Sequence, residues 1–243
     1  MKIDVICMMY QEEMLAGLFC DHYKFVDTIH IIYDTDTSDN TKAICEQYPN
    51  VIIHPYTFPD MMDDALKQEQ VNKMAAELDV DWILAVDADE FIFNKDTVDT
   101  VRAYLEESKE TIISVTEWQV YKHVTENKIC SYIPALLQRR YGDKGTAFFQ
   151  KPCVIRGRLG ISWQAGCHIL SENIPYPVLE NGLQSTHWCN ADIDLAIHRR
   201  IYGRKLRQSK YNLETGLSCH NHNITEDDII AVCKAHEHDP LLF

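Results

Sequence analysis

Residues 82–93 read Trp-Ile-Leu-Ala-Val-Asp-Ala-Asp-Glu-Phe-Ile-Phe, an apolar run interrupted by acids. The part 82–86 predicts a buried strand, and the acids follow at its carboxyl end. Side chains two positions apart in an extended chain point the same way, so we expect Asp87 and Asp89 on one side. Two such carboxylates are hard oxygen ligands suited to Mg²⁺ or Mn²⁺. The stretch therefore predicts a metal site at a strand end.

Short strands and helices alternate before and after this run. We expect strands at 3–9, 28–33, 51–54, 82–86 and 112–115. We expect helices at 14–23, 41–48 and 63–78, and a further helix capped by Thr97. The alternation predicts an α/β fold with a mixed, mainly parallel sheet flanked by helices. Ligands bind at the carboxyl ends of strands in such sheets, and the second acidic cluster, 34–39, also follows a strand.

The alternation fades in the second half of the chain. Strands are expected at 118–123 and 148–155, and a helix at 192–205. Thr225 and the acids after it resemble a capping box, which would begin a last helix that ends before Pro240.

Composition excludes several classes of protein. The chain has 243 residues, 46% of them hydrophobic, which suits one domain with a sizeable core. The formal net charge of −14 argues against nucleic acid as a partner, because a phosphate-binding face should be basic. No apolar run is long enough for a transmembrane segment. Nine cysteines without a CxxC pair indicate reduced thiols and a cytoplasmic protein.

One segment departs from this acidic composition. From Arg199 to Lys210 there are six Arg and Lys side chains and no acid. Such a segment is either a local anion site or the solvated face of a helix.

Several motifs, taken in order, resemble the family-2-like group of bacterial GT-A glycosyltransferases, which is often associated with surface polysaccharides. They are the acidic run 82–93, Tyr10-Gln11-Glu12-Glu13, Asp34 ahead of Thr37-Ser38-Asp39, Lys151-Pro152 followed by Gly166-Cys167-His168, and His187-Trp188 ahead of the basic helix. The resemblance covers roughly residues 1–210.

The resemblance implies a GT-A fold and an enzyme. Residues 1–210 would form the transferase domain, with 1–116 as its nucleotide-binding half and 117–210 as its acceptor and metal half, and 211–243 would be a helical extension. The enzyme would move a sugar from a nucleotide-diphosphate sugar to a glycan or lipid-linked acceptor, in bacterial capsule or lipopolysaccharide assembly. It would work in the cytoplasm, and the inner face of the membrane or a biosynthetic complex would suit such an acceptor.

The resemblance also implies residue roles. The metal ion, Mn²⁺ or Mg²⁺, would be held by Asp87, Asp89 and His187. The nucleotide sugar would be bound by Tyr10, Glu12, Asp34, Asp87, Ala88, Arg199, Arg200 and Lys205. An inverting transfer needs a general base, and the candidates are His168, Glu117 and Glu172.

Three other interpretations stay open at this stage. Asp34 and Asp36 nearly match the DxDx(T/V) loop of haloacid-dehalogenase-type Mg-dependent phosphatases, although Ser38 departs from that pattern. A non-catalytic module that binds a nucleotide sugar is the second interpretation. The third is a structural zinc among the C-terminal cysteines and histidines, whose spacing is not a standard zinc pattern. They are Cys219, His220, His222, Cys233, His236 and His238.

Overall fold

The structure, a computed structural model, describes residues 1–95, 97–143, 149–165, 169–172, 174–177 and 182–243. The strands in this part of the chain are β1 (Ile3–Met9), β2 (Thr28–Asp34), β3 (Val51–Tyr56), β4 (Trp82–Ala85), β5 (Glu90–Phe93), β6 (Ile112–Gln119), β7 (Phe149–Arg156) and β8 (Gln184–His187). The α-helices are α1 (Glu13–His22), α2 (Thr41–Cys45), α3 (Asp64–Glu77), α4 (Val101–Glu107), α5 (Ala135–Gln138), α6 (Ile193–Ile197), α7 (Lys210–Thr215) and α8 (Glu226–Ala235).

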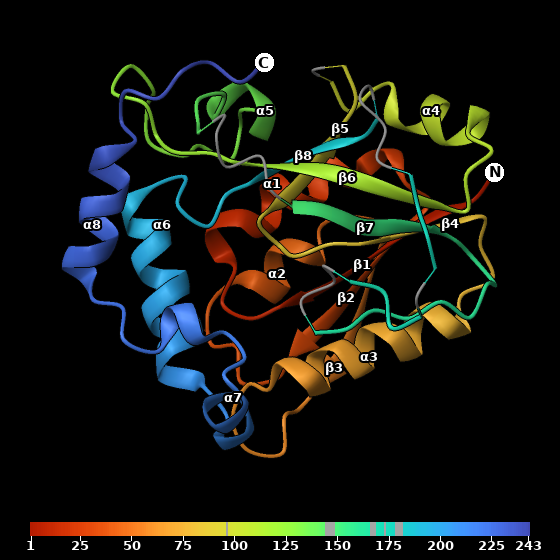
Figure 1. Cartoon of the computed structure of the whole chain (residues 1–243), viewed down its shortest axis with the longest axis horizontal. Coiled ribbons are helices and arrows are strands. Elements are labelled where there is room, and N and C mark those ends of the chain that lie inside the picture. Colours follow the sequence, from red (N-terminus) through yellow and green to blue (C-terminus); the bar gives the residue numbers. More distant parts are fainter. Residues whose placement is uncertain (96, 144–148, 166–168, 173, 178–181) are drawn as a thin grey trace.

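Within the described residues, the eight strands form one sheet in the order β3-β2-β1-β4-β7-β6-β8-β5 (Figure 1). The first four strands of this order run parallel to one another. β7 is antiparallel to both β4 and β6, while β8 is parallel to β6 and antiparallel to β5. The predicted fold class, a mixed and mainly parallel sheet flanked by helices, is confirmed.

Two strands differ from the expectation. The sequence predicts separate strands at 112–115 and 118–123, but β6 runs continuously from the first range into the start of the second, ends at Gln119, and has an irregularity between Ile113 and Val115. The run 82–93 is two strands, because the chain turns between β4 and β5 and the amide of Glu90 donates to the carbonyl of Asp87 (3.1 Å). The acids therefore lie on a turn between strands that are far apart in the sheet.

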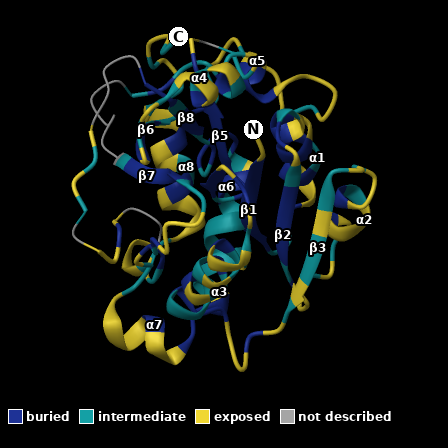
Figure 2. Cartoon of the chain, turned by 90° about the vertical axis from the view of Figure 1, so that its right-hand side faces the viewer, coloured by how far each residue is buried: buried dark blue, intermediate teal, exposed yellow. Residues whose placement is uncertain are grey.

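Helices cover both faces of the parallel half. β1 is buried along its whole length, whereas the edge strand β3 is only partly covered (Figure 2). Successive side chains of a strand point to opposite faces, and β1 follows this rule. Val5 and Cys7 join the core under α1, and Ile6 and Met8 join the core under α3.

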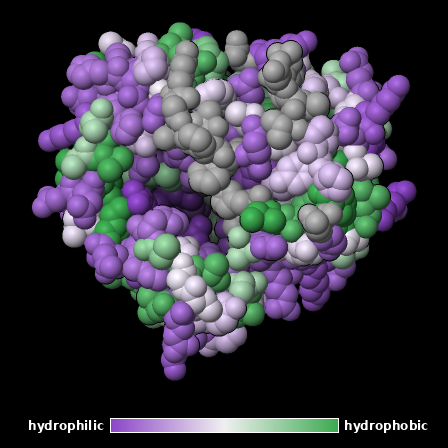
Figure 3. Space-filling model, viewed as in Figure 1, coloured by the Kyte–Doolittle hydropathy of each residue, from purple (hydrophilic) through white to green (hydrophobic). Residues whose placement is uncertain are grey.

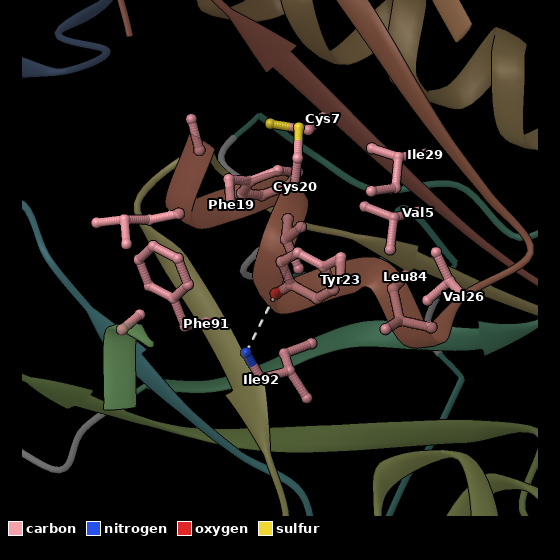
Figure 4. Close-up of a cluster of buried hydrophobic side chains, with 14 of the residues drawn as sticks. Val5, Cys7, Phe19, Cys20, Tyr23, Val26, Ile29, Leu84, Phe91 and Ile92 are labelled. Atoms are coloured by element: carbon pink, nitrogen blue, oxygen red, sulfur yellow. Dashed lines mark hydrogen bonds between the residues drawn. The ribbon is translucent and has the colours of Figure 1, made fainter. Parts of the chain in front are cut away.

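Helix α1 also fixes the position of β5. The hydroxyl of Tyr23, just after α1, donates to the carbonyl of Glu90 (2.8 Å) and accepts from the amide of Ile92 (3.1 Å; Figure 4). The Nε2 of His22 contacts the carbonyl of Ile92 at 2.7 Å. A buried aromatic cluster with Phe19 and Phe91 surrounds these bonds. The acidic turn is therefore anchored to the first half of the chain.

The C-terminal third is helical and packs against the rest. The expected helix at 192–205 is present, but only its first turn is α6, and His198–Arg204 continues as a π-helix. The capping box at Thr225 is confirmed and begins α8, which packs against α6 through Ile229 and Cys233. The domain boundary at residue 210 stays a prediction. None of the described helices combines the length and the apolar character that a membrane crossing requires.

Candidate functional site

A cleft opens at the carboxyl ends of β1, β2 and β4. Parallel pairing of these strands brings together the loop at 10–12, Asp34 at the end of β2, and Asp87 just after β4. Side chains from α3 and from the π-helix complete the walls, which enclose about 540 Å³ including the solvent at the mouth. Figure 3 shows a hollow surrounded by hydrophilic side chains on this face of the molecule.

The basic segment reaches the cleft through its π-helix. A π-helix bonds residue i to i+5, so Arg199 and Arg204 lie on the same side and both line the cleft. The same spacing directs Arg200 and Lys205 to the neighbouring side, which faces the C-terminal segment. Arg200 donates to the side chains of Asn190 and Asn221, and Lys205 to the carbonyl of Ile224 (2.7 Å). Neither of these two predicted binding residues is among the side chains that line the cleft.

Asp87 lies in the cleft beside two lysines. Its Oδ1 accepts from the Nζ of Lys67 on α3 (2.5 Å), and its Oδ2 is 3.9 Å from the Nζ of Lys151 on β7. Burial would raise the pKa of Asp87, but Lys67 and Lys151 outweigh it and hold the pKa well below its usual value. Ala88 lies beside Asp87 in the wall of the cleft. Asp87 is therefore an ionised carboxylate that faces the cleft.

Asp89 takes different partners, because residues 87–90 form a turn instead of an extended strand. Its Oδ1 is 2.9 Å from the Nη2 of Arg199, and its Oδ2 is 3.2 Å from the Nε2 of His187. The other ring nitrogen of His187 is 3.3 Å from a carboxylate oxygen of Glu117. Burial would lower the pKa of His187, but Cys189 and the two carboxylates raise it well above its usual value. Asp89, His187 and Glu117 thus form a charged row behind the cleft.

The three predicted metal ligands do not form one ligand set. Asp87 lines the cleft, whereas Asp89 is 2% exposed and contacts His187 directly. Both ring nitrogens of His187 face carboxylates, Asp89 on one side and Glu117 on the other. Among the described residues, no group of three or more His, Cys, Asp or Glu side chains could hold a metal ion. Asp87 is the one of the three that lines the cleft, and the metal and its ligands stay a prediction.

The candidate bases fall outside the cleft lining or outside the described residues. Glu117 is 2% exposed and contacts His187. Glu172 accepts hydrogen bonds from the amide and hydroxyl of Ser162, and the bond from the amide is the larger cause of its lowered pKa. His168 lies outside the described residues. The identity of the base stays a prediction.

Glu12 closes the cleft opposite Asp87. It is buried, and Arg199 donates to its Oε2. Burial raises the pKa of Glu12 to about 7, and the neighbouring guanidinium of Arg199 opposes this rise. The π-helix is held on the same loop by His198, whose Nε2 is 3.0 Å from the carbonyl of Gln11. The loop after β1 and the π-helix therefore form one wall.

The far end of the cleft combines an aromatic ring and a carboxylate. Asp34 is fully buried, and its Oδ2 accepts from the Nη1 of Arg207 (2.9 Å). The guanidinium carbon of Arg207 lies 3.6 Å from the centre of the Tyr10 ring. The Oδ1 of Asp34 accepts from the amide of Asp36 (3.0 Å). Both oxygens of Asp34 therefore accept a hydrogen bond, and the phosphatase interpretation stays untested.

Sequence reasoning missed several residues of the cleft. Lys67 carried no signal, since a lysine on a helix is ordinary, and only the fold brings it to Asp87. Arg204 and Arg207 belong to the basic segment that suggested an anion site, but the sequence did not show which members face the cleft. His198 adjoins that segment and also lines the cleft.

The C-terminal cysteines and histidines, all within the described residues, do not assemble a metal group. His236 pairs with Asp239 at 2.7 Å, and the Nε2 of His222 is 3.1 Å from the carbonyl of Leu217. Cys233 is buried against α6. His222, Cys233 and His236 therefore have separate structural contacts.

Comparisons with known proteins give likenesses to solved structures. No family model matches the chain, and no curated protein matches it in sequence. S. aureus TarS 1-349 overlaps 88% of this chain and 77% of its own, with 14% identity and a TM-score of 0.44. The same protein in complex with UDP overlaps 98% of this chain and 88% of its own, with 13% identity and a TM-score of 0.43.

A second likeness covers less of the chain. Glucosyl-3-phosphoglycerate synthase from Mycobacterium tuberculosis, in complex with Mn²⁺, UDP and glucosyl-3-phosphoglycerate, overlaps 49% of this chain and 44% of its own. The identity is 15% and the TM-score is 0.35. All these scores lie below 0.5, so the proposals below rest on the contacts within this chain.

Proposed function

We propose that the chain is a glycosyltransferase that uses a nucleotide-diphosphate sugar as its donor. One observation carries the proposal: a single cleft holds an aromatic ring and an acceptor carboxylate at one end, and a group of cations around Asp87 at the other. This distribution matches a nucleotide, which has a flat base at one end and a diphosphate at the other. The position at the carboxyl ends of parallel strands supports the same conclusion.

Tyr10 and Asp34 form the end that suits a base. An aromatic side chain stacks on any base, and this stacking contributes about 1–3 kcal/mol per base. The carboxylate of Asp34 only accepts hydrogen bonds when ionised, so it selects a base or ribose that presents a donor. Asp34 is fully buried, and such a bond would be shielded from water.

Lys67, Arg199 and Arg204 form the end that suits a diphosphate. All three line the cleft, and all three are held by carboxylates in the ligand-free chain: Asp87, Glu12 and Asp64, respectively. Guanidinium groups bind phosphate oxygens through paired N–H donors, and lysine binds them as a point charge. A diphosphate would therefore meet three positive side chains, already oriented by their partners.

A divalent ion would be held between Asp87 and the diphosphate. Mg²⁺ is commonly held by one or two carboxylates together with substrate phosphates, so Asp87 would bind Mg²⁺ or Mn²⁺ jointly with the diphosphate. When bound, such an ion supplies charge neutralisation of the departing diphosphate. Asp89 would act indirectly, since its contact with Arg199 orients a side chain of the cleft.

The proposal is tested by binding of UDP and GDP to the whole chain, measured by calorimetry with and without Mn²⁺. The wild type should bind one of them. Tyr10→Ala should weaken that binding by roughly 5- to 100-fold, as expected for a lost stacking contact. Asp87→Asn should remove any difference between the measurements with and without Mn²⁺.

A matched control is Tyr202→Ala, which removes an exposed ring of the π-helix that does not line the cleft. It should bind as the wild type does. Absence of binding for both nucleotides, or equal binding by Tyr10→Ala, would contradict the proposal.

Transfer itself needs an acceptor, and we propose a glycan or lipid-linked acceptor of a bacterial surface polysaccharide such as capsule or lipopolysaccharide. Work at the inner face of the membrane would suit a lipid-linked acceptor. The test is release of a nucleoside diphosphate from nucleotide sugars in the presence of such acceptors. Tight donor binding without release over a broad acceptor panel would instead favour a non-catalytic binding module.

A further inference from the structure

The base end of the cleft is already filled by a side chain of the protein. Arg207 is 8% exposed, and its guanidinium lies 3.6 Å from the centre of the Tyr10 ring. Its Nη1 donates to Asp34 (2.9 Å) and its Nη2 to Asp36 (3.2 Å). A flat, delocalised group that stacks on Tyr10 and donates to Asp34 makes the same contacts that a base would make there.

From this overlap we propose that Arg207 itself occupies the base subsite, and that a nucleotide binds there only when Arg207 leaves it. The inference rests on the proposed function, because it takes the Tyr10 and Asp34 end as the base subsite. A base and a guanidinium cannot stack on one face of Tyr10 and bond the same oxygen of Asp34 together. Arg207 and the donor therefore compete for the base subsite.

The residue next to Arg207 shows that the closed state, in which Arg207 occupies the base subsite, carries a cost in free energy. The side-chain amide of Gln208 is buried, and neither its oxygen nor its nitrogen has a hydrogen-bond partner. Leaving buried polar groups unpaired costs about 1–3 kcal/mol per group. An arrangement in which residues 207 and 208 turn outward would return these atoms to water. The closed state is thus stabilised by Arg207 and destabilised by Gln208.

The segment 205–208 lies between the π-helix and a fixed contact at Ser209. Before it, the π-helix ends at Arg204, and π-helical turns are frequent at functional sites. After it, the amide of Ser209 donates to the carbonyl of Met62 (3.0 Å), and the hydroxyl of Ser209 donates to Asp63 (2.8 Å). Movement of Arg207 would therefore be confined to the 3-10 helix Lys205–Arg207 and to Gln208, and would leave α7 in place.

The test uses the full chain and the better-bound of UDP and GDP as the probe. Arg207→Ala and Arg207→Met remove the occupant, so the dissociation constant should fall in both. If the open state is about one tenth of the wild-type population, the fall is about tenfold, because apparent affinity scales with the competent fraction. Lys210→Ala is the control, since it removes an exposed positive charge nearby and should leave the constant unchanged.

A second measurement uses the wild type alone and covers the case in which the variants do not fold. Amide hydrogen exchange at 205–208 should become faster when the nucleotide binds, because Arg207 loses its contacts with Tyr10 and Asp34. An unchanged or higher dissociation constant in folded variants, or slower exchange at 205–208 in the wild type, would overturn the inference. Absence of nucleotide binding in the wild type and in every variant would overturn the proposed function as well, which distinguishes the two failures.

Discussion

At the scale of single residues, the cleft is a set of charges that neutralise one another. Asp87 pairs with Lys67, Glu12 and Asp89 pair with Arg199, and Asp34 pairs with Arg207. Burying an unpaired charge is costly, so these pairs allow a dense group of ions to stay folded without a ligand. A ligand must then exchange these contacts for its own, and Arg207 is the clearest case.

A histidine away from the cleft gives a prediction at the same scale. Burial lowers the pKa of His22 from 6.5 to about 4, despite its bond to the carbonyl of Ile92. Between pH 6.5 and pH 4 the unfolded chain therefore binds a proton at His22 that the folded chain does not. The contribution of neutral His22 to the free energy of unfolding is thus complete above pH 6.5 and is lost as the pH falls towards 4. At pH 5 this loss amounts to about 2 kcal/mol.

His22→Gln keeps a donor for Ile92 and cannot titrate. Urea unfolding at pH 7 and pH 5 should show a smaller loss of stability on acidification for this variant than for the wild type. His238→Gln, at an exposed site, should behave as the wild type. Identical pH dependence for His22→Gln and wild type would contradict the assignment.

At the scale of elements, the start of α3 joins the two sides of the cleft. The Oδ1 of Asp63 accepts from the amides of Ala65 and Leu66, which caps the helix that carries Lys67. Its Oδ2 accepts from the hydroxyl of Ser209 at the start of α7. The carboxylate of Asp63 thus holds both α3, which carries Lys67 at the diphosphate end of the cleft, and Ser209, which follows the Arg207 segment.

Asp63→Ala should lower the free energy of unfolding by about 2 kcal/mol, since it removes a helix cap and leaves the buried hydroxyl of Ser209 without this acceptor. The measurement is denaturant unfolding, and Asp60→Ala at an exposed site on the same loop is the control. A change below about 0.5 kcal/mol, the usual effect of surface substitutions, would show that the cap is dispensable.

At the scale of the whole molecule, a buried ion pair joins two strands of the mixed half of the sheet, β7 and β5. Lys151 on β7 donates to the carboxylate of Glu90, the first residue of β5, and both side chains are almost fully buried. β7 and β5 are not neighbours in the sheet, so the pair joins strands that share no backbone bonds. Burial raises the pKa of Glu90 to about 7, and Lys151 opposes the rise.

Lys151→Met should cost about 3–5 kcal/mol of stability at pH 8, because it leaves the Glu90 carboxylate buried without this cation. The cost should shrink at pH 5, where Glu90 takes a proton and becomes neutral. The double variant Lys151→Met/Glu90→Gln should recover much of the loss at pH 8. Thermal unfolding of the three proteins at both pH values is the measurement, and a pH-independent cost would contradict this account.

Much of the fold could be predicted because its signals are local. Apolar runs followed by acids indicated β1, β2 and β4, and helical spacing indicated α1 and α3, since each element buries one face of its own residues. The split of 82–93 into two strands could not be predicted in this way. Both strands are apolar, and only their distant positions in the sheet require the turn between them.

The sequence by itself determined that carboxylates would stand at the carboxyl ends of parallel strands, because strand periodicity and chain direction decide which residues follow each strand. Only the tertiary structure decided which cation meets each carboxylate. Lys67 lies 20 positions from Asp87, and Arg207 lies 173 positions from Asp34. Such pairs depend on how α3 and the π-helix pack against the strand ends. That packing reflects burial summed over the whole core, and no short stretch of sequence records it.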